Sequence, residues 1–290
     1  MVRANGIDLW QETLGDEDGA PLLLIAGLGG QAIAWPDEFC WGLADRGFRV
    51  IRFDNRDAGL SQHFGEPVDL GAAAGVLLAG QPVAAPYLLS DMAADAVGLL
   101  DALELPAAHV LGVSLGGMVA QTLAIEHPSR VTSLTSLMSS TGRAAPEPPD
   151  PELLAHMLRP VGDSLEEVLA AGLAWSALVA SPDHHDADLT SAYIRRAFAR
   201  SPRRDGLGRQ LLAIVASPSR EAALAQLQVP TLVVHGSVDR LIRPEEGRRT
   251  AELVAGAQLL ELEGLGHDLP VFFWAPIIEA VTSLAAGCAG

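Results

Sequence analysis

The chain has 290 residues, of which 49% are hydrophobic and 19% are charged, a composition typical of a globular protein rather than a disordered one. Its 19 basic and 36 acidic residues give a formal net charge of −17 at pH 7. Because this negative field repels phosphate groups, nucleic acid and anionic membranes are disfavoured as partners. A neutral small molecule is the easier ligand.

We expect no signal for export or membrane insertion. Its beginning, MVRANGIDLW, lacks an apolar signal core. No uninterrupted apolar run approaches the roughly 18 residues of a membrane span. The two cysteines, Cys40 and Cys288, lie far apart in the sequence and in no redox or metal motif. We therefore expect a soluble, cytoplasmic protein without a membrane span.

Strand patterns dominate the first part of the chain. The pattern predicts strands over residues 7–12 and 21–26, on either side of the turn-prone GDEDGA. Together they predict that the chain opens with a hairpin. WPDEFCWGLADRG has helical spacing and stops at Gly47, and FRVIRFD is the next strand. Residues 65–86 are rich in Gly, Ala and Pro, which predicts a long loop or short irregular helices over the surface.

The next segments alternate between helix and strand. The pattern predicts an amphipathic helix over 88–105, with Ser90 as its cap, and a buried strand at AHVLGV. A helix over 117–127 and the strand VTSLTSLMSS follow. This order of elements implies a parallel sheet with helices on both faces.

The second half of the chain interrupts this rhythm and then resumes it. Residues 151–222 are mainly helical in pattern and contain no convincing buried strand, which indicates an inserted cap. We divide the chain into a core of residues 1–140 and 223–290 and a helical cap of residues 141–222. The remaining core elements are the strand VPTLVVHG, a helix over 244–255, the strand AQLLELEG and a helix over 275–286.

The segment GVSLG, residues 112–116, contains the candidate for a catalytic nucleophile. It matches G-x-S-x-G, with a strand before it and a helix after it, as this motif requires. Small residues permit a sharp turn that raises Ser114 at the C-terminal end of a parallel strand, beside free amides at the helix start. A glycine-rich turn that serves packing alone is the alternative. We expect Ser114 to be a nucleophile.

A serine nucleophile needs a histidine base and a carboxylate that orients it. His267, just beyond the last predicted strand, lies at the same sheet edge as Ser114 and is the expected base. His235 is the main rival, but its place before GSVDR favours a supporting role. Asp239 gives the order Ser, Asp, His that this topology uses, although an Asp after a strand is otherwise a turn or cap residue.

A tetrahedral intermediate also needs donors for its negative oxygen. The glycine-rich IAGLGG, residues 25–30, follows an early strand and permits close backbone approach, although a tight loop without this role is the alternative. We assign the two oxyanion donors to the amides of Leu28 and Leu115, with the amide of Gly29 as the alternative to that of Leu28.

Some residues are candidates for the substrate pocket, with core packing as the alternative for the aromatic ones. Gly29 belongs to the oxyanion loop, Trp35 and Phe39 follow it, and Trp175 lies in the predicted cap. We expect Gly29, Trp35 and Trp175 to bind substrate.

Three polar segments are expected to have structural rather than catalytic or metal-binding roles. FDNRDAGLS, residues 53–61, is expected to brace the catalytic turns by side-chain hydrogen bonds rather than to hold a metal. The adjacent histidines of SPDHHDAD diverge on a helix, so no metal site is expected there. The basic residues within 195–209 are expected to form a solvated helix face, with steering of an anionic substrate as the alternative.

The motifs AGLGG, RFDNRDAGLS, GVSLGG, HGSVDRLI and GLGHDLP occur in the order of the α/β-hydrolase superfamily, which the chain resembles over nearly its full length. In WPDEF and DNRDAGLS it is similar to the methylesterases of anthracycline (aclacinomycin-type) polyketide biosynthesis. The resemblance implies a mostly parallel eight-stranded sheet, a helical cap, and hydrolysis through an acyl-enzyme without cofactor or metal. Ala26 replaces the histidine of the common His-Gly oxyanion pattern, so only the backbone donors remain.

The apolar cap and the scarcity of polar specificity motifs favour a hydrophobic ester or lactone as substrate, such as the methyl ester of an aromatic polyketide in antibiotic biosynthesis. A cofactor-free perhydrolase or a carbon–carbon hydrolase would use the same triad. A ligand-binding protein that has lost its chemistry on a hydrolase scaffold is the alternative of another class.

Overall fold

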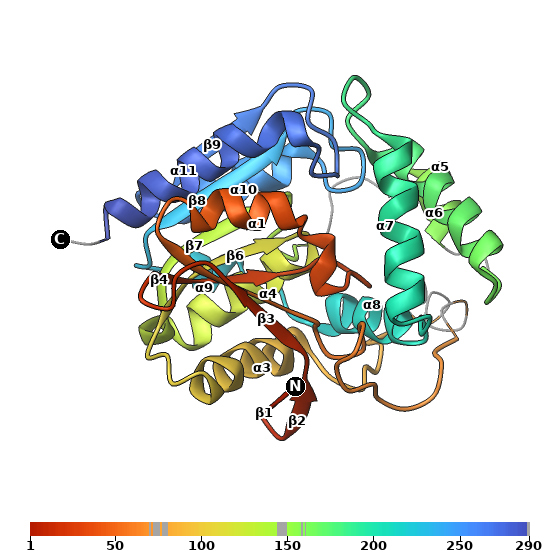
Figure 1. Ribbon diagram of the computed structural model, residues 1–290, viewed down its shortest axis with the longest axis horizontal. Coiled ribbons are helices and arrows are strands. Elements are labelled where there is room, and N and C mark those ends of the chain that lie inside the picture. Colours follow the sequence, from red (N-terminus) through yellow and green to blue (C-terminus); the bar gives the residue numbers. More distant parts are fainter. Residues whose placement is uncertain are drawn as a thin grey trace.

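A twisted parallel sheet forms the centre of the molecule (Figure 1). The computed structural model describes residues 1–69, 71, 76, 81–143, 150–157, 159 and 161–288. The strands of this sheet are β3 (Gln11–Leu14), β4 (Ala20–Ile25), β5 (Phe48–Phe53), β6 (Ala108–Val113), β7 (Val131–Leu137), β8 (Thr231–Gly236) and β9 (Gln258–Leu262). They lie in the order β3-β5-β4-β6-β7-β8-β9, with β3 antiparallel to β5 and the other pairs parallel.

The start of the chain differs from the prediction. β1 (Val2–Ala4) and β2 (Ile7–Leu9) pair with each other through a two-residue turn in which Asn5 and Gly6 have φ of 47° and 75°. The main sheet of the described residues therefore has seven strands instead of the eight implied by the resemblance. The predicted hairpin between 7–12 and 21–26 is also wrong, because β5 lies between β3 and β4.

The apolar run of β4 explains this order. Leu22 and Leu24 pack into one buried cluster, and Leu23 and Ile25 pack into another on the opposite face. A strand that is buried on both faces belongs in the middle of a parallel sheet. β4 accordingly pairs with β5 on one side and β6 on the other, which leaves β3 an outer position beside β5.

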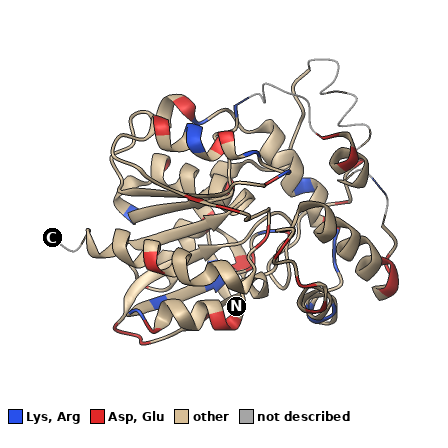
Figure 2. Ribbon diagram, turned by 90° about the horizontal axis from the view of Figure 1, so that it is seen from above, with Lys and Arg blue, Asp and Glu red and all other residues tan. Residues whose placement is uncertain are grey.

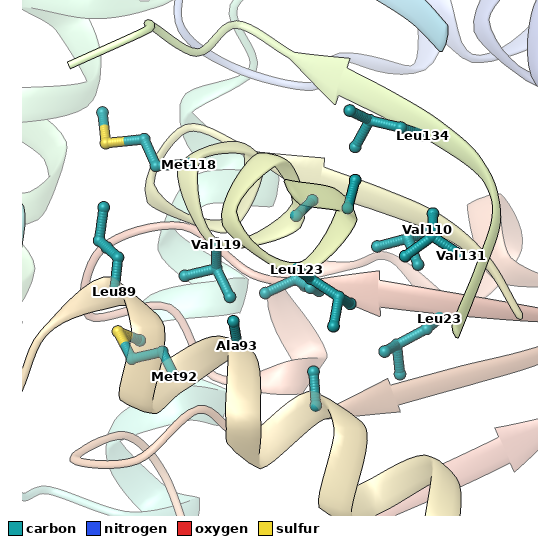
Figure 3. Packing of buried hydrophobic residues seen from close by; sticks show 14 of the residues in the cluster. Leu23, Leu89, Met92, Ala93, Val110, Met118, Val119, Leu123, Val131 and Leu134 are labelled. Atoms are coloured by element: carbon teal, nitrogen blue, oxygen red, sulfur yellow. The ribbon is translucent and has the colours of Figure 1, made fainter. Parts of the chain in front are cut away.

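Helices cover both faces of the sheet. α3 (Leu89–Ala102) and α4 (Leu115–Glu126) lie on the face of Leu23, where Met92 and Ala93 approach Val119 and Leu123 (Figure 3). α1 (Asp37–Ala44) and α11 (Trp274–Ala286) bury residues in the cluster on the other face. α10 (Pro244–Leu253) connects β8 to β9. These layers hold β6, β8 and β9 in fixed register, so the loops after them meet at one edge.

The N-terminus of α3 is capped by a different residue than predicted. The carboxylate of Asp91 accepts a hydrogen bond of 2.7 Å from the amide of Leu88. Ser90 is the second residue of the helix, so the prediction of Ser90 as the cap is wrong. A carboxylate in the first turn also interacts favourably with the helix dipole.

The inserted segment is helical, with α5 (Pro151–Met157), α6 (Leu165–Val179), α7 (Ala187–Arg200), α8 (Gly206–Ala216) and α9 (Glu221–Leu224). α5, α6 and α7 lie together at one side of the sheet (Figure 1). Ala213 of α8 and Leu224 of α9 belong to the core cluster. Of the predicted cap range 141–222, residues 144–149, 158 and 160 lie outside the described residues, as do 70, 72–75 and 77–80 of the predicted loop 65–86.

Charged residues are distributed over helices and loops around the molecule, with acidic ones in the majority (Figure 2). Within the described ranges, no helix has the length and apolarity needed to cross a membrane. The basic residues of 195–209 do not all form a solvated face as expected. Arg200 pairs with Asp54 at 2.8 Å and Arg209 pairs with Asp57 at 2.7 Å, so this segment fastens the inserted helices to the core.

The pair of Arg209 and Asp57 generates a stability prediction. Arg209 is 1% exposed, and the hydroxyl of Tyr87 also donates to Asp57 at 2.6 Å. Because Arg209→Met leaves a buried carboxylate without its cation, we expect the free energy of unfolding to fall by about 3–5 kcal/mol in urea denaturation.

The matched control is Arg248→Met. Arg248 is an exposed residue that pairs with Glu261 at 2.6 Å, and exposed pairs contribute little to stability. We expect a much smaller change for this variant. Similar losses for both variants would contradict the assigned role of Arg209.

Candidate active site

Ser114 lies in a sharp turn between β6 and α4. Its backbone has φ of 55° and ψ of −118°, a left-handed conformation that costs energy for a residue with a side chain. A side chain on Gly112 would collide with the carbonyl oxygen of Gly116, and one on Gly116 would collide with that of Ile25. The two glycines of G-x-S-x-G are therefore required by the close approach of three backbone segments.

Three loops at the C-terminal edge of the sheet bring the predicted triad together. Ser114 follows β6, Asp239 follows β8 and His267 follows β9. The distance between Ser114 Oγ and His267 Nε2 is 3.0 Å, and that between His267 Nδ1 and Asp239 Oδ2 is 2.7 Å. In the neutral tautomer with Nδ1 protonated, the hydroxyl donates to Nε2 and Nδ1–H donates to the carboxylate. This geometry fits a serine that loses its proton to histidine.

Asp239 is 3% exposed and is held by several donors. Its Oδ1 accepts hydrogen bonds of 2.9 Å from the amides of Leu241 and Ile242. Burial raises the pKa of this carboxyl, but the charge of His267 and hydrogen bonds from His235 and His267 outweigh that effect and hold the pKa well below its usual range. The carboxylate is therefore ionised at neutral pH.

His235, the rival base, approaches the same oxygen of this carboxylate as His267 does. Its Nε2 donates to the carbonyl of Ile242 at 2.8 Å and lies 3.5 Å from Asp239 Oδ2. The His235 side chain thus orients the loop that carries Asp239, whereas it is His267 whose Nε2 reaches the Ser114 hydroxyl.

The backbone amides of the predicted oxyanion loop, residues 25–30, differ in their hydrogen bonding. The amide of Gly29 donates to Gln210 Oε1 at 2.8 Å, and Gln210 Nε2 donates to the carbonyl of Arg56 at 2.8 Å. In the described part of the chain, the amide of Leu28 has no acceptor, and Leu115 begins α4, so its amide has no acceptor within the helix. The amides of Leu28 and Leu115 are thus available for an oxyanion, whereas that of Gly29 is engaged.

A cavity of about 1500 Å³ adjoins Ser114 and His267. Trp35 and Trp175, the aromatic residues expected to bind substrate, both line it, and Trp35 also stacks on the buried Phe39 with 5.8 Å between the ring centroids. Gly29 is not among the lining residues, and a side chain at this position would collide with that of Leu207. Much of the wall is apolar and includes Met118, Phe198, Leu211 and Ile242.

FDNRDAGLS braces the neighbouring turns. Asn55 donates to the carbonyl of Ala26 at 3.0 Å, and Asp54 accepts 2.7 Å and 2.8 Å hydrogen bonds from the amides of Ala32 and Leu60. Among the described residues, no group of three or more His, Cys, Asp or Glu side chains is arranged to hold a metal ion. This loop therefore shapes the oxyanion segment.

Comparison with known proteins defines the family. Residues 20–273 match the alpha/beta hydrolase fold family, and the chain belongs to this family. It is 30% identical to the rhodomycin D methylesterase DnrP of Streptomyces peucetius, over 97% of this chain and 96% of that protein. It is also 28% identical to a 2-hydroxymuconate semialdehyde hydrolase of Pseudomonas sp. (strain CF600), over 86% of this chain and 81% of that protein.

A solved structure shares the fold. The enol-lactonase from Burkholderia xenovorans LB400 superposes with a TM-score of 0.76 at 22% identity, covering 98% of each chain. The predicted α/β-hydrolase fold and the similarity to methylesterases of anthracycline biosynthesis are confirmed.

The environment of Asp239 generates a pH prediction. Its native pKa lies below the unfolded value of about 3.9, so its stabilising contribution is complete well above that pH and is lost as the pH falls through the native pKa. We expect the difference in unfolding free energy between the protein and Asp239→Asn to be fully present at pH 7 and pH 5 and to be smaller at pH 3. Urea denaturation at these three pH values measures it, and a difference at pH 3 as large as that at pH 5 would contradict the prediction.

Proposed function

We propose that the protein is a serine hydrolase that cleaves a carboxylic ester of a hydrophobic small molecule, with Ser114 as nucleophile. The observation that carries this proposal is the hydrogen-bonded chain from Ser114 through His267 to Asp239 beside a largely apolar cavity. Asp239 fixes the tautomer of His267 and stabilises its positive form.

The reaction proceeds through an acyl-enzyme. Ser114 Oγ attacks the carbonyl carbon while its proton passes to His267 Nε2, and the amides of Leu28 and Leu115 stabilise the negative oxygen. The carbon–oxygen bond to the alcohol then breaks, and the alcohol leaves with that proton. A water molecule gives a proton to His267 and attacks the acyl carbon, which releases the carboxylic acid and restores the Ser114 hydroxyl.

The size and the lining of the cavity favour a substrate with a large, apolar acyl group. Its volume of about 1500 Å³ and its aromatic residues Trp35 and Trp175 would accommodate a fused aromatic ring system. Together with the similarity to a rhodomycin D methylesterase, this favours the methyl ester of an aromatic polyketide. No cofactor is needed for this reaction.

A second candidate is hydrolysis of a carbon–carbon bond by the same triad. The similarity to a 2-hydroxymuconate semialdehyde hydrolase favours it. A non-catalytic ligand-binding role would leave Ser114 unreactive. A fluorophosphonate probe distinguishes these classes, because either enzyme becomes labelled at Ser114 and a non-catalytic protein does not.

Ser114→Ala is the direct test of the mechanism. Because the variant lacks the nucleophile, we expect turnover of p-nitrophenyl esters to fall by about 10⁴-fold or more. Circular dichroism should show that the fold is unchanged. Undiminished turnover by the folded variant would rule out Ser114 as the nucleophile.

A substrate panel tests the proposed class. We expect kcat/KM to be higher for methyl esters of large aromatic acids than for methyl acetate, because only the former fill the apolar cavity. A panel that varies acyl and alcohol size, with a vinylogous 1,5-diketone beside it, separates the two candidate reactions. Turnover of the diketone alone, or of small polar esters alone, would exclude the proposed ester class.

A further inference from the structure

The loop that carries His267 is fastened to the inserted helices just after α6. The amide of His267 donates to the carbonyl of Val179 at 2.7 Å, and the amide of Gly266 donates to Ser181 Oγ at 2.9 Å. Both the amide and the hydroxyl of Ser181 donate to Oδ1 of Asp268, at 3.0 Å and 2.6 Å. The Ser181 side chain is fully buried. Asp268 is thus held at one oxygen by two donors.

The other oxygen of Asp268 is left for a ligand. Within the described part of the chain, Oδ2 has no hydrogen-bond partner, and this atom is not fully buried. Asp268 lines the cavity together with Ser114 and His267. Asp268 directly follows His267 in the chain, and its carboxylate interacts electrostatically with the His267 ring. Oδ2 is therefore a candidate acceptor on the wall of the largely apolar cavity that also contains Ser114 and His267.

We propose that Asp268 is a specificity-determining residue whose Oδ2 accepts a hydrogen bond from a hydroxyl group that the ester carries close to its reacting carbonyl. This proposal rests on the proposed function and narrows its substrate class to hydroxylated apolar esters. The hydrogen bonds from Ser181 fix the orientation of the carboxylate before substrate binds, which lowers the entropic cost of recognition.

The electrostatic setting agrees with this role. Burial raises the pKa of the Asp268 carboxyl, while hydrogen bonds from Ser181 and the charges of His185 and His267 oppose the rise. A partly desolvated carboxylate gains from a further donor, and a hydrogen bond to a charged acceptor is stronger than one between neutral groups.

The variant Asp268→Asn tests the proposal without a change in side-chain size. Because Ser181 directs two donors at the Oδ1 position, the amide oxygen must occupy that position. The amide NH₂ then takes the place of Oδ2 and presents a donor to the cavity. The substitution converts an acceptor into a donor at the proposed contact.

The experiment compares matched esters of similar size. Methyl mandelate is paired with methyl phenylacetate, and methyl 3-hydroxy-3-phenylpropanoate with methyl 3-phenylpropanoate. The quantity measured is the ratio of kcat/KM for the hydroxylated ester to that for its partner. We expect the wild-type ratio to exceed one for at least one pair and to fall roughly 10- to 100-fold in Asp268→Asn. The ratio cancels any general effect of the variant on His267.

Asp163→Asn is the matched control, since Asp163 also lines the cavity and loses the same charge. We expect it to leave the ratio unchanged. An equal fall in both variants would mean that charge alone matters and would overturn the proposal. Wild-type ratios at or below one for both pairs would overturn it even if Asp268→Asn does not fold.

The measured ratios and the labelling of Ser114 distinguish a wrong role for Asp268 from a wrong proposed function. Hydrolysis of all four esters with the same ratio in wild type and Asp268→Asn would leave Ser114 in place and reduce Asp268 to a structural tie. Absence of turnover for every ester, with no fluorophosphonate labelling of Ser114, would remove the proposed function and this inference with it.

Discussion

A left-handed backbone at Ser114 raises its hydroxyl above the ends of β6 and α4, and close packing makes this conformation possible. Gly112 and Gly116 let the carbonyl of Ile25 and the first turn of α4 approach within distances that no side chain would allow. The surrounding sheet supplies the packing energy that offsets the strain. The same approach brings the oxyanion loop, which follows β4, beside the first amide of α4. A single steric constraint therefore sets the position of the hydroxyl and of both proposed oxyanion donors.

The inserted helices contribute to the site as well as covering it. Gln210 of α8 orders the oxyanion loop through Gly29, and Ser181 orders the histidine loop through Asp268 and Gly266. The buried pair of Arg209 and Asp57 holds α8 against the core. The two halves of the proposed machinery are thus each supported by residues from the insertion, so the geometry of the site depends on the docking of these helices.

Sequence patterns predicted the parallel core and the meeting of Ser114, Asp239 and His267, because each of these residues follows a recognisable strand. Patterns could not reveal that β3 pairs with β5, since hydrophobic alternation defines a strand but not its partner. Gln210 and Ser181 also carried no signal. Each acts through contacts with residues more than 80 positions away, and nothing in its local sequence distinguishes it from an ordinary helix or turn residue. Asp268 lay within GLGHDLP, yet only its contacts separate it from a turn residue.

The net negative charge of the protein has a consequence for the proposed reaction. An ester is neutral, whereas the acid that its hydrolysis releases is an anion at neutral pH. If the proposed ester hydrolysis holds, the field of a protein with a net charge of −17 leaves the entering ester unaffected but repels the departing carboxylate. Because added salt screens this repulsion, product inhibition should be weakest at low ionic strength. The acidic surface would in this way act as an electrostatic bias that drives the catalytic cycle forward.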